Sequence, residues 1–382
     1  MARDWFRDQV QSLGAKTYGN TFSLSGTSRS DITWGLYLTF MQHVNGVGAQ
    51  FATFAGEDDS IPPIAMGSHL DSVATGGRFD GPLGVIGALE VVRSMKDHGI
   101  KTHAPIALIN WTNEEDSVDA LHASKANNGS DETLGAALHS IGYVGDGPNT
   151  FDEFPMSAHF EIHVEQQKSL EKAGKSVGWV DAWHGISMFE MTFHGEDGHA
   201  NTYDMEGRKD ALVGASKVIT ELERLAYSAN GRSTTTNIQS GPVGACNIQS
   251  WTKIVFCVMH PELSALEDMG RTAKEKAESI AFAQGLGLEV ARILHLEPGT
   301  FWPEAVDCVK RACGDKGMGA PTLTAHDSTM TTLVCPTAMV FARAKDGVSH
   351  CAKEWSTQED CAESALTLGK AVLNFDQLLM DE

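Results

Sequence analysis

The chain has 382 residues, more than one hydrophobic core usually serves, so two domains are expected. Hydrophobic residues make up 42% of the chain and charged residues 21%, which excludes a disordered or fibrous protein. The formal net charge of -21 opposes binding to nucleic acid or to an anionic membrane and favours a small-molecule partner.

The first part of the chain alternates between helical and strand patterns. Residues 3–13 have the spacing of an amphipathic helix, and residues 64–68 form an apolar run that predicts a buried strand. A helix is expected over residues 81–95, and a second buried strand over residues 104–111. This order predicts a largely parallel sheet, at whose edge polar residues that follow the strands collect.

A smaller mixed segment interrupts this pattern between residues 184 and 295. Its expected elements are strands at 187–194 and 253–259 and helices at 209–226 and 261–284. The first pattern then resumes with a buried strand at 337–341 and a closing helix at 359–379.

The predicted fold class is therefore α/β, with a mostly parallel mixed sheet flanked by helices and an inserted smaller α+β domain. The catalytic domain is expected to be discontinuous, with residues 1–183 and 296–382, and the inserted domain is expected to span residues 184–295.

Cysteine usage and the N-terminus bear on the compartment. The seven cysteines are an odd number without zinc-finger spacing, which is typical of a reducing environment. The first residues lack the apolar segment of a signal peptide, and no run of about eighteen apolar residues predicts a membrane span. We expect a cytoplasmic protein.

The first candidate site residues follow the strand at 64–68. His69 and Asp71 come directly after it, and Asp80 lies between glycines further along. A histidine ligand needs an acceptor on its second ring nitrogen, which makes Asp71 a supporting carboxylate and a candidate member of the catalytic set. By itself, a His-x-Asp pattern is more often structural.

Two adjacent carboxylates, Glu114 and Glu115, follow the second strand. Neighbouring carboxylates are costly unless a cation or a proton compensates them, so one of the pair is expected to bind metal and the other to move protons. The alternative is an acidic loop on an acidic protein.

A third group alternates in strand fashion, which places His159, Glu161, His163 and Glu165 on one face. That face is too polar for an ordinary core, and the alternative is a solvated edge strand.

His350 follows the strand at 337–341, with His326 upstream; a lone histidine there is more often structural. Together, the four groups at strand ends of one sheet suit a carboxylate-bridged pair of divalent ions such as zinc or manganese.

These residues resemble the zinc-dependent exopeptidase and amidase superfamily, specifically its hydantoinase/carbamoylase branch, which includes N-carbamoyl-amino-acid amidohydrolases, β-ureidopropionase and allantoate amidohydrolase. The matching stretches are Gly67-Ser68-His69-Leu70-Asp71-Ser72-Val73, Gly76-Gly77-Arg78-Phe79-Asp80-Gly81, Thr112-Asn113-Glu114-Glu115, His163-Val164-Glu165-Gln166, Met205-Glu206-Gly207-Arg208-Lys209-Asp210-Ala211, and Pro336 to Met339 with Ser349-His350 to Glu354.

The resemblance implies two divalent ions per subunit, zinc first and manganese, cobalt or nickel as alternatives. Asp80 would bridge them, with His69 and His163 on one ion and Glu115 and His350 on the other. Glu114 would be the general base that takes a proton from a metal-activated water and returns it to the leaving nitrogen.

The resemblance also implies that residues 184–295 form a lid that mediates a homodimer. His199 and Asn247 match lid positions that contact substrate, Gln166 matches a position near the ureido or amide group, and we place His326 in the same substrate-binding set.

Some positions depart from the family pattern. Met259 stands where relatives carry an arginine that binds the substrate carboxylate, and the stretches 21–50 and 116–125 are unlike those of relatives. These differences concern substrate recognition and leave the metal set intact.

The sequence therefore predicts a hydrolase of carbon–nitrogen bonds other than peptide bonds, acting on an N-carbamoyl, ureido or N-acyl group of a small molecule. One alternative is a repurposed biosynthetic enzyme that uses the same two ions for a non-hydrolytic condensation or acyl transfer. A less favoured alternative is a non-catalytic binding relative.

Overall fold

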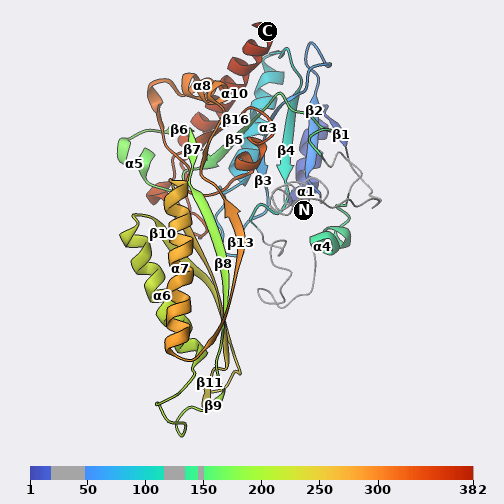
Figure 1. Ribbon diagram of the computed structural model, residues 1–382. Coiled ribbons are helices and arrows are strands. Elements are labelled where there is room, and N and C mark those ends of the chain that lie inside the picture. The colour runs from blue at the N-terminus through green and yellow to red at the C-terminus, as the bar shows by residue number, and fades with distance from the viewer. Residues whose placement is uncertain (19–47, 116–133, 145–149, 382) are drawn as a thin grey trace. The chain divides into compact units, whose positions relative to one another are not determined.

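The computed structural model describes residues 1–18, 48–115, 134–144 and 150–381. The chain divides into two compact units, one made of Met1–Ala182 with Thr300–Glu382 and the other of Trp183–Gly299 (Figure 1). Most of the unusual stretch 21–50 and all of 116–125 lie outside the described residues.

A mixed sheet forms the middle of the first unit. Its strands among the described residues are β1 (Lys16–Tyr18), β2 (Gln50–Phe54), β3 (Ile64–His69), β4 (Ile106–Trp111), β5 (Ala158–Val164), β6 (Val177–Val180), β15 (Gly317–Gly319) and β16 (Thr337–Ala342). They are ordered β1-β2-β4-β3-β5-β16-β6-β15.

The four central strands, β4, β3, β5 and β16, are parallel, and they are flanked by antiparallel pairings of β2 with β4 and of β6 with β16. Every residue of the four central strands is buried, as the apolar runs of β3, β4 and β16 predict. In β5, burial extends to the polar face of His159, Glu161 and His163. The carboxyl ends of these strands therefore meet at one edge of the sheet.

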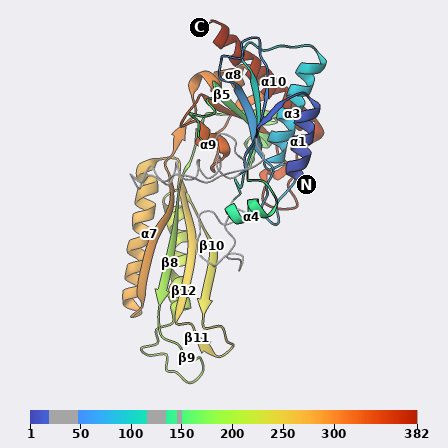
Figure 2. The same ribbon diagram turned by 90° about the vertical axis from the view of Figure 1, so that its right-hand side faces the viewer.

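Helices flank this sheet. They are α1 (Ala2–Ser12), α3 (Pro82–Asp97), α4 (Leu134–Ser140), α5 (Ser169–Ala173), α8 (Pro303–Cys313), α9 (Asp327–Thr331) and α10 (Gln358–Asp381), with 3-10 turns η1 (Gly314–Lys316) and η2 (Lys345–Gly347). The helices α3 and α8 both pack against α10, and all three contact the sheet (Figure 2). The predicted α/β class with a mostly parallel mixed sheet is confirmed.

The second unit is an antiparallel sheet covered by two helices. Its elements are β8 (Gly185–His194), β9 (Gly198–His199), α6 (Ala211–Ser228), β10 (Arg232–Gly241), β11 (Asn247–Ile248), β12 (Trp251–His260), α7 (Leu263–Ala283) and β13 (Gly287–Leu296), while β7 (Ala182–Trp183) and β14 (Gly299–Thr300) lie at its ends. The main strands are ordered β10-β12-β8-β13, and β9 pairs with β11.

Alternation along the strands builds the core of this unit. Phe189, Met191 and Phe193 of β8 alternate with more exposed residues and pack with Phe256 of β12 against α6 and α7. The role of this unit as a lid or dimerisation domain stays a prediction. Among the described residues, none of the helices has both the length and the apolar character of a membrane span.

Candidate metal centre and active site

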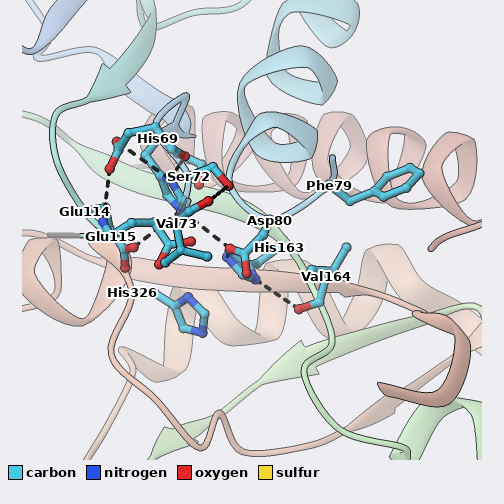
Figure 3. A network of polar contacts seen from close by, with 12 residues as sticks. His69, Ser72, Val73, Phe79, Asp80, Glu114, Glu115, His163, Val164 and His326 are labelled. Carbon is cyan, nitrogen blue, oxygen red and sulfur yellow. Dashed lines mark hydrogen bonds and ion pairs between the residues drawn. The ribbon is translucent and has the colours of Figure 1, made fainter. Parts of the chain in front are cut away.

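The predicted ligands of the first unit gather at the carboxyl edge of the parallel strands. His69 is the last residue of β3, Glu115 follows β4, His163 lies near the end of β5, and His350 follows β16 and η2. Figure 3 shows the side chains of His69, Asp80, Glu115 and His163 close together. The strand order therefore brings together residues that are far apart in the sequence.

Asp80 lies at the centre of this group. Its Oδ1 is 2.9 Å from His163 Nε2 and 3.8 Å from His69 Nε2, and its Oδ2 is 3.3 Å from His350 Nε2. Burial alone raises the pKa of a carboxyl group, but the His163 and His350 imidazoles hold the pKa of Asp80 well below its usual range. Asp80 is thus an anionic carboxylate with an oxygen directed to each side.

Glu115 and His350 form the other side of the group, with Glu115 Oε2 at 3.2 Å from His350 Nε2. His350 has a φ of 55° and an exposed fraction of 49%, so this side faces solvent more than the side of His69 and His163. Three overlapping groups of side chains have ligand atoms within 4.8 Å of one another: His69 with Asp80 and His163, His69 with Glu114 and Glu115, and Asp80 with Glu115 and His350.

Two unsatisfied atoms show that a cation fits here. The His69 Nδ1–H donates to the carbonyl oxygen of Asp71 over 3.0 Å, which leaves a lone pair on Nε2. That Nε2 is buried and has no hydrogen-bond partner, and the same holds for Glu115 Oε1. Since buried polar atoms are rarely unpaired and imidazole with carboxylate suits Zn²⁺ or Mn²⁺, the residues fit divalent metal ions.

His163 and Asp80 form the tightest pair of the group. The His163 Nδ1–H donates to the carbonyl oxygen of Val164 over 2.9 Å, so its Nε2 is directed at Asp80 (Figure 3). Burial alone lowers the pKa of His163, but the Asp80 carboxylate raises it to about 10. Without metal, a proton on this imidazole therefore compensates the Asp80 charge.

Gly81 makes room for His69. Its φ is 78°, and an added Cβ would lie 2.3 Å from the His69 ring. Only glycine adopts this backbone conformation without strain and leaves the ring in place. The glycine after Asp80 is thus needed for both ligands to approach each other.

Glu114 lies beside the ligands, with Oε2 at 3.5 Å from His69 Nε2 and an exposed fraction of 16%. Burial, and then the charge of Glu115, raise the pKa of Glu114 well above its usual value. A carboxyl group with a raised pKa next to a cation site can accept and release a proton.

Asp71 supports the site differently from the sequence-based expectation. The acceptor for His69 Nδ1 is the Asp71 carbonyl oxygen, and the carboxylate is 3.8 Å away from that nitrogen. The carboxylate instead accepts the backbone N–H groups of Asn113 and Glu115, each over 3.1 Å. Asn113 has a φ of 59°, a left-handed conformation that is uncommon for residues other than glycine, and these two hydrogen bonds flank Glu114.

Two of the predicted substrate-binding residues lie among the ligands. Gln166 Nε2 donates to Asp80 Oδ2 over 3.0 Å, and its Oε1 is buried without a hydrogen-bond partner. His326 is buried, shares a 2.9 Å hydrogen bond with Thr322 Oγ1, and has its ring centroid 4.2 Å from that of His163. Burial, and then the charge of His163, lower the pKa of His326 well below its usual value, so this imidazole is neutral.

The other two lie in the second unit, where His199 and Asn247 face each other across the β9–β11 pair and are exposed. The Asn201 N–H donates to His199 Nδ1 over 3.2 Å, which leaves the proton on Nε2. Met259, which stands at the position of the family's carboxylate-binding arginine, is the second-to-last residue of β12. Its partner in the neighbouring strand β10 is Arg232.

The edge-strand alternative for residues 159–165 is wrong, because β5 lies inside the sheet between β3 and β16. Its carboxylates are satisfied internally: Glu161 accepts the Ser68 hydroxyl over 2.8 Å and the Ser328 N–H over 2.9 Å. Glu161 therefore supports the segments of Ser68 and Ser328 rather than acting as a ligand of its own.

Comparisons with known proteins agree with this geometry. The model of peptidase family M20/M25/M40 matches residues 65–374. An N-carbamoyl-L-amino-acid amidohydrolase of Rhizobium meliloti is 30% identical, over 88% of this chain and 85% of that protein. An N-carbamoyl-L-amino acid amidohydrolase of Geobacillus stearothermophilus is 28% identical, over 97% of each chain.

Among solved structures, an amidase of the hydantoinase/carbamoylase family from Burkholderia vietnamiensis has a TM-score of 0.86 and 30% identity, over 98% of this chain and 89% of that chain. The expected enzyme class, a hydrolase of carbon–nitrogen bonds other than peptide bonds, and the family resemblance are both confirmed. By sequence, fold and site, the chain belongs to peptidase family M20/M25/M40, and it is similar to the hydantoinase/carbamoylase amidases.

Proposed function

We propose that the protein is a metal-dependent amidohydrolase that cleaves an N-carbamoyl, ureido or N-acyl carbon–nitrogen bond of a small molecule, with Glu114 as general base. The observation that carries this proposal is the position of Glu114: its carboxyl group lies 3.5 Å from the unpartnered His69 Nε2 and next to the ligand candidate Glu115. A proton carrier at the edge of a cation site is what hydrolysis of an unreactive amide requires.

Five residues would hold two divalent ions that share Asp80: His69 and His163 on one side, and Glu115 and His350 on the other. When bound, the ions would supply Lewis acidity and lower the pKa of a nearby water. The carboxylate of Asp71 holds the loop of Glu114 and Glu115 in place through two backbone N–H groups.

The Glu114 carboxylate would accept one proton from the attacking water while the water oxygen forms a bond to the carbonyl carbon of the substrate. The same carboxyl group then delivers that proton to the nitrogen as the carbon–nitrogen bond breaks, so the base is regenerated. Glu114 is only partly exposed, at 16%, so few water molecules compete with the substrate nitrogen for this proton.

The names of relatives that act on N-carbamoyl amino acids support the proposed substrate class. Gln166 and His326 would contact the substrate in the first unit, and His199 and Asn247 stay candidate contacts from the family resemblance. The buried, unpartnered Gln166 Oε1 suits an N–H donor such as that of a ureido group.

We also propose a homodimer formed through the second unit and a cytoplasmic location. The helices α6 and α7 cover one face of its sheet, and the edge strand β10 exposes Ile238. The seven cysteines, all within the described residues, are free, as is usual in a reducing compartment.

The experiment is a mass-spectrometric turnover assay of protein stripped with chelator and then reconstituted with Zn²⁺ or Mn²⁺. The panel contains N-carbamoyl, ureido and N-acyl compounds, each with and without a free carboxylate. We expect release of the amine only after metal is restored. Absence of turnover across the panel, with metal bound, would contradict the proposal and favour a non-hydrolytic reaction.

A further inference from the structure

Glu354 is a buried carboxylate directed at the backbone of Asp80. Its exposed fraction is 3%, and its Oε1 accepts the N–H of Phe79 over 2.7 Å and the N–H of Asp80 over 3.0 Å. No cation is paired with it among the described residues, so these two donors are its main stabilising contacts.

The backbone of Glu354 also reaches the other side of the candidate metal site. Its N–H donates to the carbonyl oxygen of Cys351 over 3.1 Å and closes the turn that follows His350. Glu354 thus connects the segment of Asp80 with the segment of His350. Glu354 and Asp80 themselves are 274 positions apart in the sequence.

Close packing fixes this contact. A Cβ added to Gly77 would lie 2.2 Å from Glu354 Oε1, so the loop before Asp80 approaches the carboxylate at a distance that only glycine allows. The neighbouring residues also pack together. The Phe79 and Trp355 rings lie edge to face with centroids 5.8 Å apart, and the Arg78 guanidinium lies 5.2 Å from the Trp355 ring centroid.

We propose that Glu354 is a positioning residue for Asp80. Two N–H donors on one carboxylate oxygen fix the peptide on which the Asp80 side chain is mounted, and that side chain must point between His163 and His350 to serve both halves of the site. Groups that orient a ligand in this way typically change metal affinity by about 10- to 100-fold when removed.

This inference rests on the proposed metal function of the cluster. The test measures Mn²⁺ binding to the metal-free full-length protein by calorimetry, for wild type, Glu354→Gln, Glu354→Ala and Gly77→Ala. The matched control is Asp376→Asn, since Asp376 is also a buried carboxylate that accepts two successive backbone N–H groups, those of His103 and Ala104, but lies away from the ligands.

We expect the Mn²⁺ dissociation constant to rise by about 10- to 100-fold in Glu354→Ala, and less in Glu354→Gln, whose amide oxygen still accepts the N–H groups. Gly77→Ala displaces the same carboxylate and should weaken Mn²⁺ binding while leaving Glu354 in the chain. Asp376→Asn should lower the melting temperature and keep wild-type affinity.

Wild-type affinity in folded Glu354→Ala or Gly77→Ala would overturn the inference, as would an equal loss of affinity in Asp376→Asn. If Glu354→Ala does not fold, Gly77→Ala decides the question by the same measurement. Failure of the wild-type protein to bind Mn²⁺ would instead overturn the proposed metal function itself.

Discussion

Arg3 of the first helix donates from Nη2 to Thr112 Oγ1 over 2.9 Å, so α1 supports the loop that carries Glu114 and Glu115. Arg3 also donates to the carbonyl oxygen of Gly48. Burial lowers the pKa of Arg3, although the nearby Asp71 carboxylate opposes this shift. The helix and the loop of Glu114 and Glu115 are therefore coupled through one half-buried guanidinium.

Replacing this guanidinium tests the coupling. Arg3→Met should lower the free energy of unfolding by about 1.5–3 kcal/mol, because buried acceptors lose a charged donor. Chemical denaturation of the metal-free protein measures this change. The control is Arg7→Met on the same helix, whose side chain is 37% exposed and pairs with Asp4 and Asp8. Equal stability of the two variants would refute the coupling.

His159 makes stability depend on pH. Burial lowers the pKa of His159 to about 3, against 6.5 in the unfolded chain, and its Nε2 accepts the Trp111 indole N–H over 3.3 Å. Above pH 6.5 both states are neutral at this residue. Between pH 6.5 and about 3, only the unfolded chain binds a proton at His159. In this range, His159 lowers the free energy of unfolding by about 1.4 kcal/mol for each unit that the pH falls.

Comparison with His159→Gln isolates that contribution. Denaturation of metal-free protein between pH 4 and 6 should give a slope that is shallower in the variant by about one proton. Identical slopes would show that His159 is protonated in the folded protein.

His350→Ala should remove one of the two ions. His350 lies on the Glu115 side of Asp80, whereas His69 and His163 lie on the other side. We therefore expect the bound Mn²⁺ to fall from two ions to one per chain, as measured by elemental analysis after dialysis. Retention of two ions would place His350 outside the metal set.

Chelation should destabilise the protein. When the free metal concentration is 100 times the dissociation constant, binding adds about 2.7 kcal/mol to the unfolding free energy. Its removal leaves Glu114 and Glu115 adjacent with only imidazoles to compensate them. Scanning calorimetry with and without EDTA measures the effect, and an unchanged melting temperature would argue against a metal in this cluster.

The parts of the fold that sequence predicts are those with local patterns. The buried strands β3, β4, β5 and β16 are apolar runs or alternate regularly, and His69 and His163 lie at or near their ends. In contrast, the sequence of β10 gives no strand signal, because Ile238 is the one apolar side chain in a run of polar residues.

Long-range contacts account for what the sequence missed. Neither Arg3 nor Glu354 lies in a ligand pattern of its own, and their hydrogen bonds join residues 109 and 274 positions apart in the sequence. The Asp71 carboxylate was assigned to the His69 ring from its sequence distance, but backbone geometry placed the carbonyl oxygen there instead.

The assay that tests the central claim most directly compares wild type with Glu114→Gln on one N-carbamoyl substrate, with bound metal measured in both proteins. We predict that kcat falls by about 10²- to 10⁴-fold while the metal content is unchanged, because the amide keeps the shape of Glu114 but cannot accept the proton. Wild-type kcat in the variant would contradict the account, since Glu114 would then not be the base.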